Sequence, residues 1–87
     1  PLKDILDNAG IKDITVIGAM SHMCVDATVR AAFDYGYGVT TVEDACATMD
    51  LEFNDTQVPA VQVHATIMAA FEFMYGEVVD TQTWLAR

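Results

Sequence analysis

Basic residues are scarce in this sequence of 87 residues, which contains 4 Lys and Arg against 13 Asp and Glu. The resulting net charge of −9 at pH 7 repels phosphate backbones and anionic lipid headgroups. We therefore expect no nucleic-acid partner and no role at a membrane surface.

Cysteines and long apolar runs are scarce as well. The two cysteines, Cys24 and Cys46, are too few for a disulfide scaffold and are expected to stay reduced. No apolar run approaches the roughly 18 residues that a membrane span needs, and residues 1–4 lack the pattern of a signal peptide. These features predict a soluble, cytoplasmic protein, and 87 residues suffice for one domain but not for two.

Glycine-rich and metal-binding motifs are absent too. Gly18 is not followed by glycines at dinucleotide-binding spacing, and no phosphate-loop ending is present. His22 and His64 lie far apart in the sequence, without a cluster of further cysteines and histidines. The sequence therefore predicts no cofactor and no metal ion, and a nucleotide-binding half-domain is the least favoured alternative.

What the sequence does contain is an alternation of helical and strand patterns. Helical spacing of apolar residues, bounded by glycine or proline, predicts helices over residues 2–9, 21–36 and 59–76, and a short final helix capped by Thr81. Short β-branched runs predict strands over residues 13–18, 39–43 and 77–80, and the polar residues 50–57 predict a loop with one or two helical turns. Strands that alternate with helices predict an α/β domain with a parallel sheet.

The predicted sheet is small for the apolar content of the chain. Hydrophobic residues make up 53% of the sequence, although a domain of this size buries only about 60% of the surface of its unfolded chain. Parallel sheets also need helices over both faces. We therefore expect apolar surface to face a partner chain or a further segment, and the sheet to be part of a larger one.

Cys24 is a candidate nucleophile because of its predicted position. With Ser21 as the N-cap, Cys24 lies in the first turn of the helix that follows the first strand, where open α/β sheets bind ligands. Unpaired N–H groups and the helix dipole favour a thiolate there, and the same amides can bind an oxyanion. The alternative is inert packing, which is common for a free cysteine.

Three further residues are expected to have structural roles. Cys46, between two alanines, has no such electrostatic setting and is expected in the core. His22, two residues from Cys24 on a helix, points away from it and is expected at the rim. His64, in the long helix, is expected to be a hydrogen-bonded structural histidine.

The segment GAMSHMCV, residues 18–25, resembles the cysteine-centred motif of the isochorismatase-like cysteine hydrolases, which include nicotinamidases and carbamoyl-compound amidohydrolases. The likeness extends to residues 36–39, 44–47 and 79–81 and to His64. It implies a three-layer α/β/α fold on a parallel sheet, of which this chain holds only a part. Residues 1–87 would then be the C-terminal portion of a single isochorismatase-like domain.

The resemblance also implies a chemistry, namely hydrolysis of a small amide or carbamoyl substrate through a cysteine thioester. Cys24 would be the nucleophile, and the N–H groups of Cys24 and Met20 would bind the oxyanion, with a cis peptide between Ala19 and Met20. The isochorismatases proper lack the cysteine, so Cys24 favours amidase chemistry.

An aspartate base, a supporting lysine and any metal ligands would come from an N-terminal half that precedes this chain. None of the nearby acids and lysines stands in the corresponding motif: Lys3, Asp4, Asp7, Lys12 and Asp13. The chain alone is expected to be inactive.

The sequence leaves one rival function open and also predicts self-association. A catalytically inactive assembly or small-ligand-binding module of the same fold is the main rival to the enzyme. A homo-oligomer is expected in either case, and its interface or an ordinary core would use the aromatic residues Tyr35, Tyr37, Phe53, Phe73 and Trp84.

Overall fold

The computed structural model describes all 87 residues and contains four α-helices, five strands and two π-helical turns. The helices are α1 (Leu2–Asn8), α2 (Asp26–Asp34), α3 (Ala60–Ala70) and α4 (Thr81–Leu85). The strands are β1 (Asp13–Ala19), β2 (Gly38–Ala47), β3 (Leu51–Phe53), β4 (Thr56–Val58) and β5 (Glu77–Val79). One π-helical turn, Ser21–Val25, precedes α2, and the other, Phe71–Tyr75, follows α3. None of these helices has both the length and the apolar character that crossing a membrane requires.

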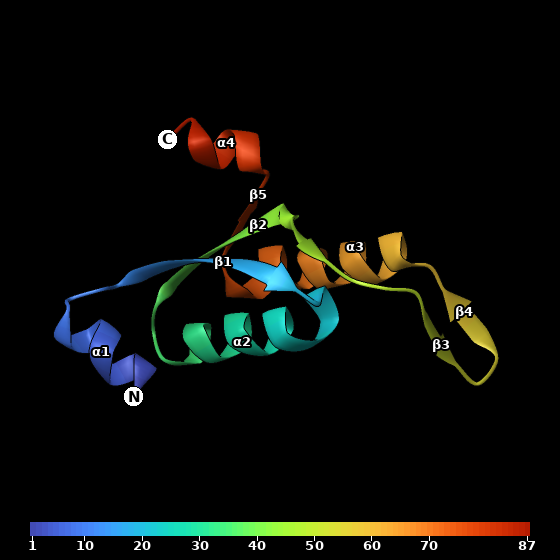
Figure 1. Cartoon of the computed structure of the whole chain (residues 1–87), viewed down its shortest axis with the longest axis horizontal. Coiled ribbons are helices and arrows are strands. Elements are labelled where there is room, and N and C mark those ends of the chain that lie inside the picture. The colour runs from blue at the N-terminus through green and yellow to red at the C-terminus, as the bar shows by residue number, and fades with distance from the viewer.

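Three strands form a parallel sheet in the order β1-β2-β5 (Figure 1). The pairing of β1 with β2 continues to the last residue of each strand, Ala19 opposite Ala47, across a register shift that follows Val16. The predicted α/β class is confirmed. The predicted end of the second strand at Glu43 is wrong, because the pairing resumes beyond the shift.

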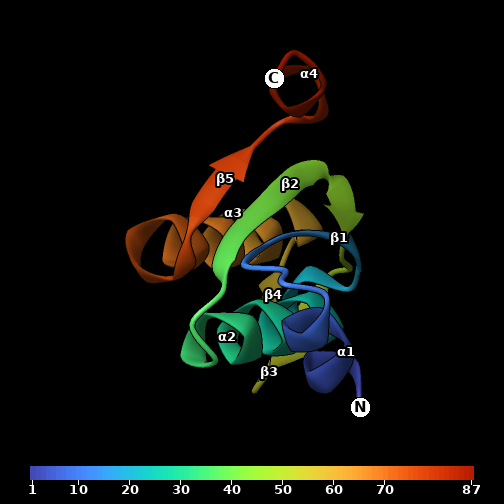
Figure 2. The ribbon, with the colours of Figure 1, turned by 90° about the vertical axis from the view of Figure 1, so that its left-hand side faces the viewer.

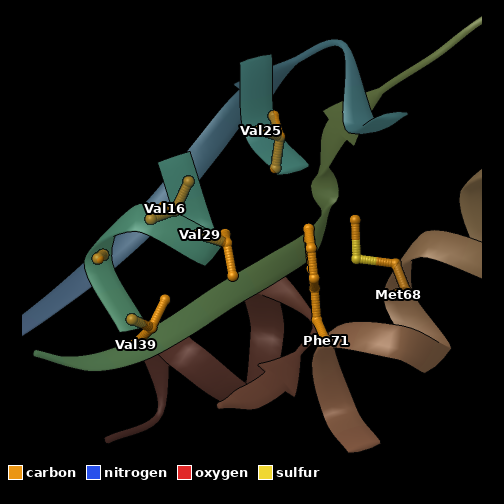
Figure 3. Close-up of a cluster of buried hydrophobic side chains, with 7 residues drawn as sticks. Val16, Val25, Val29, Val39, Met68 and Phe71 are labelled. Atoms are coloured by element: carbon orange, nitrogen blue, oxygen red, sulfur yellow. The ribbon is translucent and has the colours of Figure 1, made fainter. Parts of the chain in front are cut away.

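The core lies between the sheet and the helices α2 and α3 (Figure 3). Val29 of α2 and Phe71 after α3 are each only 1% exposed. Burying one such side chain stabilises the fold by about 1.5–3 kcal/mol. The cluster comprises Val16, Val25, Val29, Ala32, Val39, Met68 and Phe71.

The two faces of the sheet are covered unequally. α2 and α3 lie against one face, and only the short helix α4 lies over the other (Figure 2). Successive side chains of β1 therefore meet different surroundings, because they point to opposite faces. Val16 is 8% exposed, whereas Ile17 is 62% exposed. This open apolar face is the kind of surface that the surplus of hydrophobic residues predicted.

Residues 50–57 do not contain the predicted helical turns. β3 and β4 pair antiparallel as a hairpin, from Leu51 opposite Val58 to Phe53 opposite Thr56. The hairpin projects from one end of the molecule (Figure 1). The two turn residues, Asn54 and Asp55, have positive φ angles of 48° and 65°. This backbone matches the twist of a two-residue hairpin, and asparagine and aspartate tolerate it, so the polar stretch forms a turn.

The helical spacing predicts apolar stripes from Val25 to Phe33 and from Val63 to Met74, and the exceptions are Thr28, Phe33 and Met74, which are exposed. Val25 and Val29 are buried, but Phe33 is 37% exposed. Met74 is 55% exposed, because the chain leaves α3 through a π-helical turn and the 3.6-residue period is lost. The Phe33 ring instead packs edge-on against Tyr75, with 5.2 Å between centroids.

The cap predicted for the final helix is also wrong. The Asp80 carboxylate accepts a hydrogen bond from the Thr83 N–H at 2.7 Å and is the N-cap of α4. Thr81 is the first helical residue, and its N–H and hydroxyl donate to Asp44 Oδ1 at 2.8 and 2.6 Å. Asp44 occupies the hydroxyl that capping would need, and it ties α4 to β2.

Gly76 allows β5 to begin directly beside β2. Its φ angle is 149°, and a Cβ atom at this position would overlap the carbonyl oxygen of Val39. Gly10, after α1, also has a positive φ angle, 74°, but no atom lies within 4 Å of the corresponding Cβ position. An alanine at Gly10 would therefore incur only the cost of the backbone conformation, whereas an alanine at Gly76 would also incur a clash.

We predict that Gly76→Ala destabilises the chain much more than Gly10→Ala. Both substitutions incur the cost of a positive φ angle, about 1–2 kcal/mol. Gly76→Ala adds an overlap with backbone that cannot move aside, worth about another 1–3 kcal/mol. Urea denaturation of the two variants measures the difference, and equal losses of unfolding free energy would contradict the close approach of Gly76 to Val39.

Polar contacts tie α1 to the segment before β2. The Asp7 carboxylate accepts hydrogen bonds from Lys3 Nζ and from the Tyr37 hydroxyl, each at 2.5 Å. These two hydrogen bonds, that from Lys3 first, lower the pKa of Asp7 below its ordinary value of 3.8. A depressed carboxylate pKa means that the contribution of Asp7 is present above pH 3.8 and is lost as the pH falls through the folded-state value.

We predict that α1 loosens on acidification below pH 3.8 and that Asp7→Asn removes this dependence. The asparagine keeps the shape of the side chain without its charge, so α1 should be loosely held at every pH. Amide hydrogen exchange over residues 2–8 reports the change. Asp4→Asn, in the same helix, is the matched control and should behave like the unmodified chain.

Candidate active site

The turn after β1 lies at the carboxyl end of the parallel sheet. The chain leaves β1 at Ala19 and continues through the π-helical turn Ser21–Val25 into α2. The Met20 carbonyl accepts hydrogen bonds from the N–H groups of Met23 and Val25 at 3.0 and 3.2 Å. These bonds close the turn, so that Met20 and Cys24 belong to a single loop of backbone.

Ser21 is not the N-cap that the sequence predicted. Met20 holds the N-cap position with extended backbone, φ −110° and ψ 149°, and no side chain caps the turn. Ser21 is the first helical residue and is 0% exposed. Its hydroxyl lies 2.8 Å from His64 Nδ1 and 3.3 Å from the Ala47 carbonyl oxygen. These partners on α3 and β2 engage the hydroxyl that would otherwise cap the helix.

Cys24 is exposed, so the alternative that it is inert core packing is wrong. It is the fourth residue of the helical turn rather than the third, and it still lies within the first turn. A hollow of about 120 Å³ adjoins it. The residues that line this hollow are Val16, Ile17, Gly18, Ala19, Cys24, Val25 and Thr28.

Met20 matches two expectations for an oxyanion-binding residue. The peptide bond between Ala19 and Met20 is cis, as the resemblance implied. The Met20 N–H donates to no backbone carbonyl, although the Met20 carbonyl accepts two hydrogen bonds. This N–H can therefore bind an oxygen of a ligand that enters beside the turn.

Both histidines have hydrogen-bond partners, and neither partner is Cys24. His22 is half-buried, and its Nδ1 lies 2.6 Å from Thr48 Oγ1. His64 is the hydrogen-bonded structural histidine that the sequence predicted, with Ser21 as its partner. Sequence reasoning did not identify Thr48 or the bond between Ser21 and His64, because no local pattern signals contacts across 26 or 43 residues.

Cys46 differs from Cys24 in its surroundings. It lies within β2, opposite Gly18, and is half-buried against the hydrophobic core. Its Sγ donates a hydrogen bond to the Val42 carbonyl at 3.4 Å. Burial raises the pKa of the Cys46 thiol. The prediction of a core role is confirmed, although the residue belongs to the strand rather than to the segment after it.

The lining of the hollow beside Cys24 contains the candidate nucleophile but no base. None of its lining residues is acidic or basic. No group of three or more His, Cys, Asp or Glu side chains in the chain is arranged to hold a metal ion. Any group that activates Cys24 must therefore come from outside the lining.

A larger hollow, of about 350 Å³, lies on the open face of the sheet. Ile17 lines both hollows, so the region beside Cys24 adjoins this open face. The lining residues of the larger hollow come from β1, β2 and α4 and are Thr15, Ile17, Val42, Ala45, Thr81, Trp84 and Leu85.

Several known proteins are similar to this chain in sequence. The isochorismatase family protein YddQ of Bacillus subtilis is 49% identical over 80 residues, which cover 92% of the chain and 44% of YddQ. A streptothricin hydrolase of Streptomyces noursei is 39% identical over 84 residues, covering 92% of the chain and 31% of the hydrolase. The chain therefore spans less than half the length of these relatives.

A solved structure shares the fold closely. The crystal structure of an isochorismatase-family protein from Oleispira antarctica superposes with a TM-score of 0.94 at 51% identity, over 99% of this chain and 46% of the other. The family model of the isochorismatase domain matches residues 1–82. With the family's sequence over nearly all of its length and the family's fold around Cys24, the chain belongs to the isochorismatase family.

Proposed function

We propose that this chain is the C-terminal portion of an isochorismatase-family cysteine hydrolase that cleaves a small amide or carbamoyl substrate. The observation that carries the proposal is the pairing of an exposed thiol, Cys24, with a free backbone donor, the Met20 N–H, across one turn. Nucleophilic attack on a carbonyl needs both groups. Two relatives with named activities, streptothricin hydrolase and a nicotinamidase of Arabidopsis thaliana that is 36% identical, support hydrolysis.

The reaction begins with the Cys24 thiolate. Its sulfur forms a bond to the carbonyl carbon, and the carbonyl π electrons move to the oxygen. The N–H groups of Met20 and Cys24 bind this oxyanion, which stabilises charge that exists only after attack. When the carbonyl re-forms, the C–N bond breaks and the amine leaves with the proton that a base took from the thiol.

Hydrolysis of the thioester completes the cycle. Water adds to the acyl carbon, the same two N–H groups bind the second oxyanion, and the bond between sulfur and carbon breaks. The products are the carboxylic or carbamic acid and the free Cys24 thiol. The base that moves these protons and the lysine that supports the thiolate belong, in this proposal, to a further half of the domain.

The small volume of the hollow beside Cys24 supports the presence of a further half of the domain. A hollow of about 120 Å³ beside Cys24 is smaller than the roughly 300 Å³ at which ligand pockets begin. The open sheet face, with Ile17 62% exposed, supplies apolar surface that a further half would cover. We use the term complete domain for this chain together with the additional half that its longer relatives contain.

The rival function is a non-catalytic module that binds a small ligand or assembles with other chains. The observation that favours it is the absence of an acid or lysine from the lining of the hollow. A module needs no activated thiol, whereas the hydrolase requires Cys24 for turnover. The first prediction below tests the exposure of Cys24, and the second distinguishes the two functions.

We predict that iodoacetamide modifies Cys24 well before Cys46. Cys24 is exposed, whereas Cys46 is half-buried and has a raised thiol pKa, and only the thiolate reacts. Peptide mass spectrometry of the chain over a time course measures both rates. Cys24→Ala should leave only the slow reaction, and a faster Cys46 would contradict the exposure of Cys24.

We predict that Cys24→Ala lowers the turnover of the complete domain by about four orders of magnitude or more, because no other group can form the thioester. Ammonia release from nicotinamide and from a panel of small carbamoyl compounds measures turnover. Cys46→Ala, which removes the other thiol, is the control and should keep the activity. Near-normal turnover by Cys24→Ala would contradict the role of Cys24 as the nucleophile, whereas absence of turnover in the unmodified complete domain would favour the non-catalytic module.

A further inference from the structure

The hydroxyl of Ser21 joins three elements, namely the turn Ser21–Val25 to which it belongs, α3 and β2. Ser21 follows Met20 directly, and its hydroxyl lies 2.8 Å from His64 Nδ1 on α3 and 3.3 Å from the Ala47 carbonyl at the end of β2. We propose that Ser21 and His64 are positioning residues that hold the Met20 N–H in place for the oxyanion. This inference rests on the proposed function.

The donor and acceptor capacities of Ser21, Ala47 and His64 determine which group donates in each hydrogen bond. The Ala47 carbonyl only accepts, and the Ser21 hydroxyl has one proton to donate. Both contacts are hydrogen bonds when Ser21 donates to Ala47 and His64 donates from Nδ1 to the Ser21 oxygen. The His64 ring then carries a proton on Nδ1, and a chain of donors runs from α3 through Ser21 to the end of β2.

Burial makes this chain of hydrogen bonds difficult to replace. Ser21 is 0% exposed, so water does not reach its hydroxyl in the folded chain. No buried side-chain nitrogen or oxygen in the chain lacks a partner. Removing the hydroxyl leaves His64 Nδ1 without its acceptor in a half-buried position, and the turn gains freedom to move.

A second contact holds the neighbouring residue in the same way. His22 Nδ1 lies 2.6 Å from Thr48 Oγ1. Ser21 and His22 are therefore tied to the adjacent residues Ala47 and Thr48, at the end of β2. Two successive side chains fixed at one strand end restrict both the position and the rotation of the backbone at Met20.

Loss of the Ser21 anchor should affect the transition state more than the binding of substrate. A backbone donor stabilises an oxyanion only when it lies within hydrogen-bond distance and points at the oxygen. Met20 is joined directly to Ser21 along the backbone, so a shift of Ser21 is transmitted to the Met20 N–H. Substrate binding, by contrast, depends on surfaces that this shift leaves in place. Loss of the anchor should therefore lower kcat and leave KM nearly unchanged.

The test uses Ser21→Ala and His64→Leu in the complete domain, with 4-nitrophenyl acetate as the acyl probe. We expect each variant to lower the Cys24-dependent kcat about 10- to 100-fold, with KM changed less than about threefold. The rate of iodoacetamide alkylation of Cys24 should stay within about twofold, because alkylation forms no oxyanion. General distortion of the site would instead change both rates.

Conservative variants provide the rescue. Ser21→Thr keeps a hydroxyl, and His64→Asn keeps a side-chain N–H donor at the position of Nδ1, so both should recover most of kcat. Val63→Ala is the matched control, since Val63 is 6% exposed, precedes His64 on α3 and lies outside the hydrogen bonds. It should lower the denaturation midpoint and leave kcat unchanged.

The outcomes separate this inference from the proposed function. Unchanged kcat in Ser21→Ala and His64→Leu, with an active unmodified domain that requires Cys24, overturns only the positioning role. Equal losses in kcat and alkylation rate, or no rescue by Ser21→Thr and His64→Asn, also overturn it. Turnover that survives Cys24→Ala, or a complete domain that shows no Cys24-dependent turnover, overturns the proposed function and this inference with it.

Discussion

The parallel pairing of β1 with β2 is the constraint on which the candidate site depends. Because the pairing reaches Ala19 opposite Ala47, the chain leaves both strands at the same edge of the sheet. The turn after β1 then meets the residues after β2, and Ser21 contacts the Ala47 carbonyl. A parallel sheet places such exits together, which explains why ligands of α/β proteins bind there. Packing of Val29 and Phe71 against the sheet keeps this edge in position.

Features that repeat along the sequence were the ones that could be predicted. Helical and β-branched periodicity identified the helices, the parallel strands and the α/β class, because one buried face imposes one period. The hairpin at residues 51–58 was missed, because Asn54 and Asp55 signal only a turn and not the strands beside it. The end of β2 was missed for a related reason: its last residues follow a register shift that only the partner strand defines.

The candidate site likewise contains residues that a local pattern predicts and contacts that no local pattern predicts. Cys24 and Met20 could be named as candidate residues because the motif that contains them is short and lies at a strand end. The bond between Ser21 and His64 joins residues 43 positions apart, and that between His22 and Thr48 spans 26. The first contact depends on how α3 packs on the sheet and the second on how β1 pairs with β2, and no pattern within one segment encodes either. Tertiary contacts also determine the role of Ser21, because its hydroxyl bonds to His64 and to the Ala47 carbonyl instead of capping the helix.

The open face of the sheet contains the only tryptophan of the sequence. Trp84 is 40% exposed on α4, lines the hollow of about 350 Å³ and donates from Nε1 to Thr15 Oγ1 at 3.3 Å. Indole emission moves to shorter wavelength when water around the ring is displaced. The fluorescence spectrum of the unlabelled chain is therefore an intrinsic optical signal for whatever comes to cover this face.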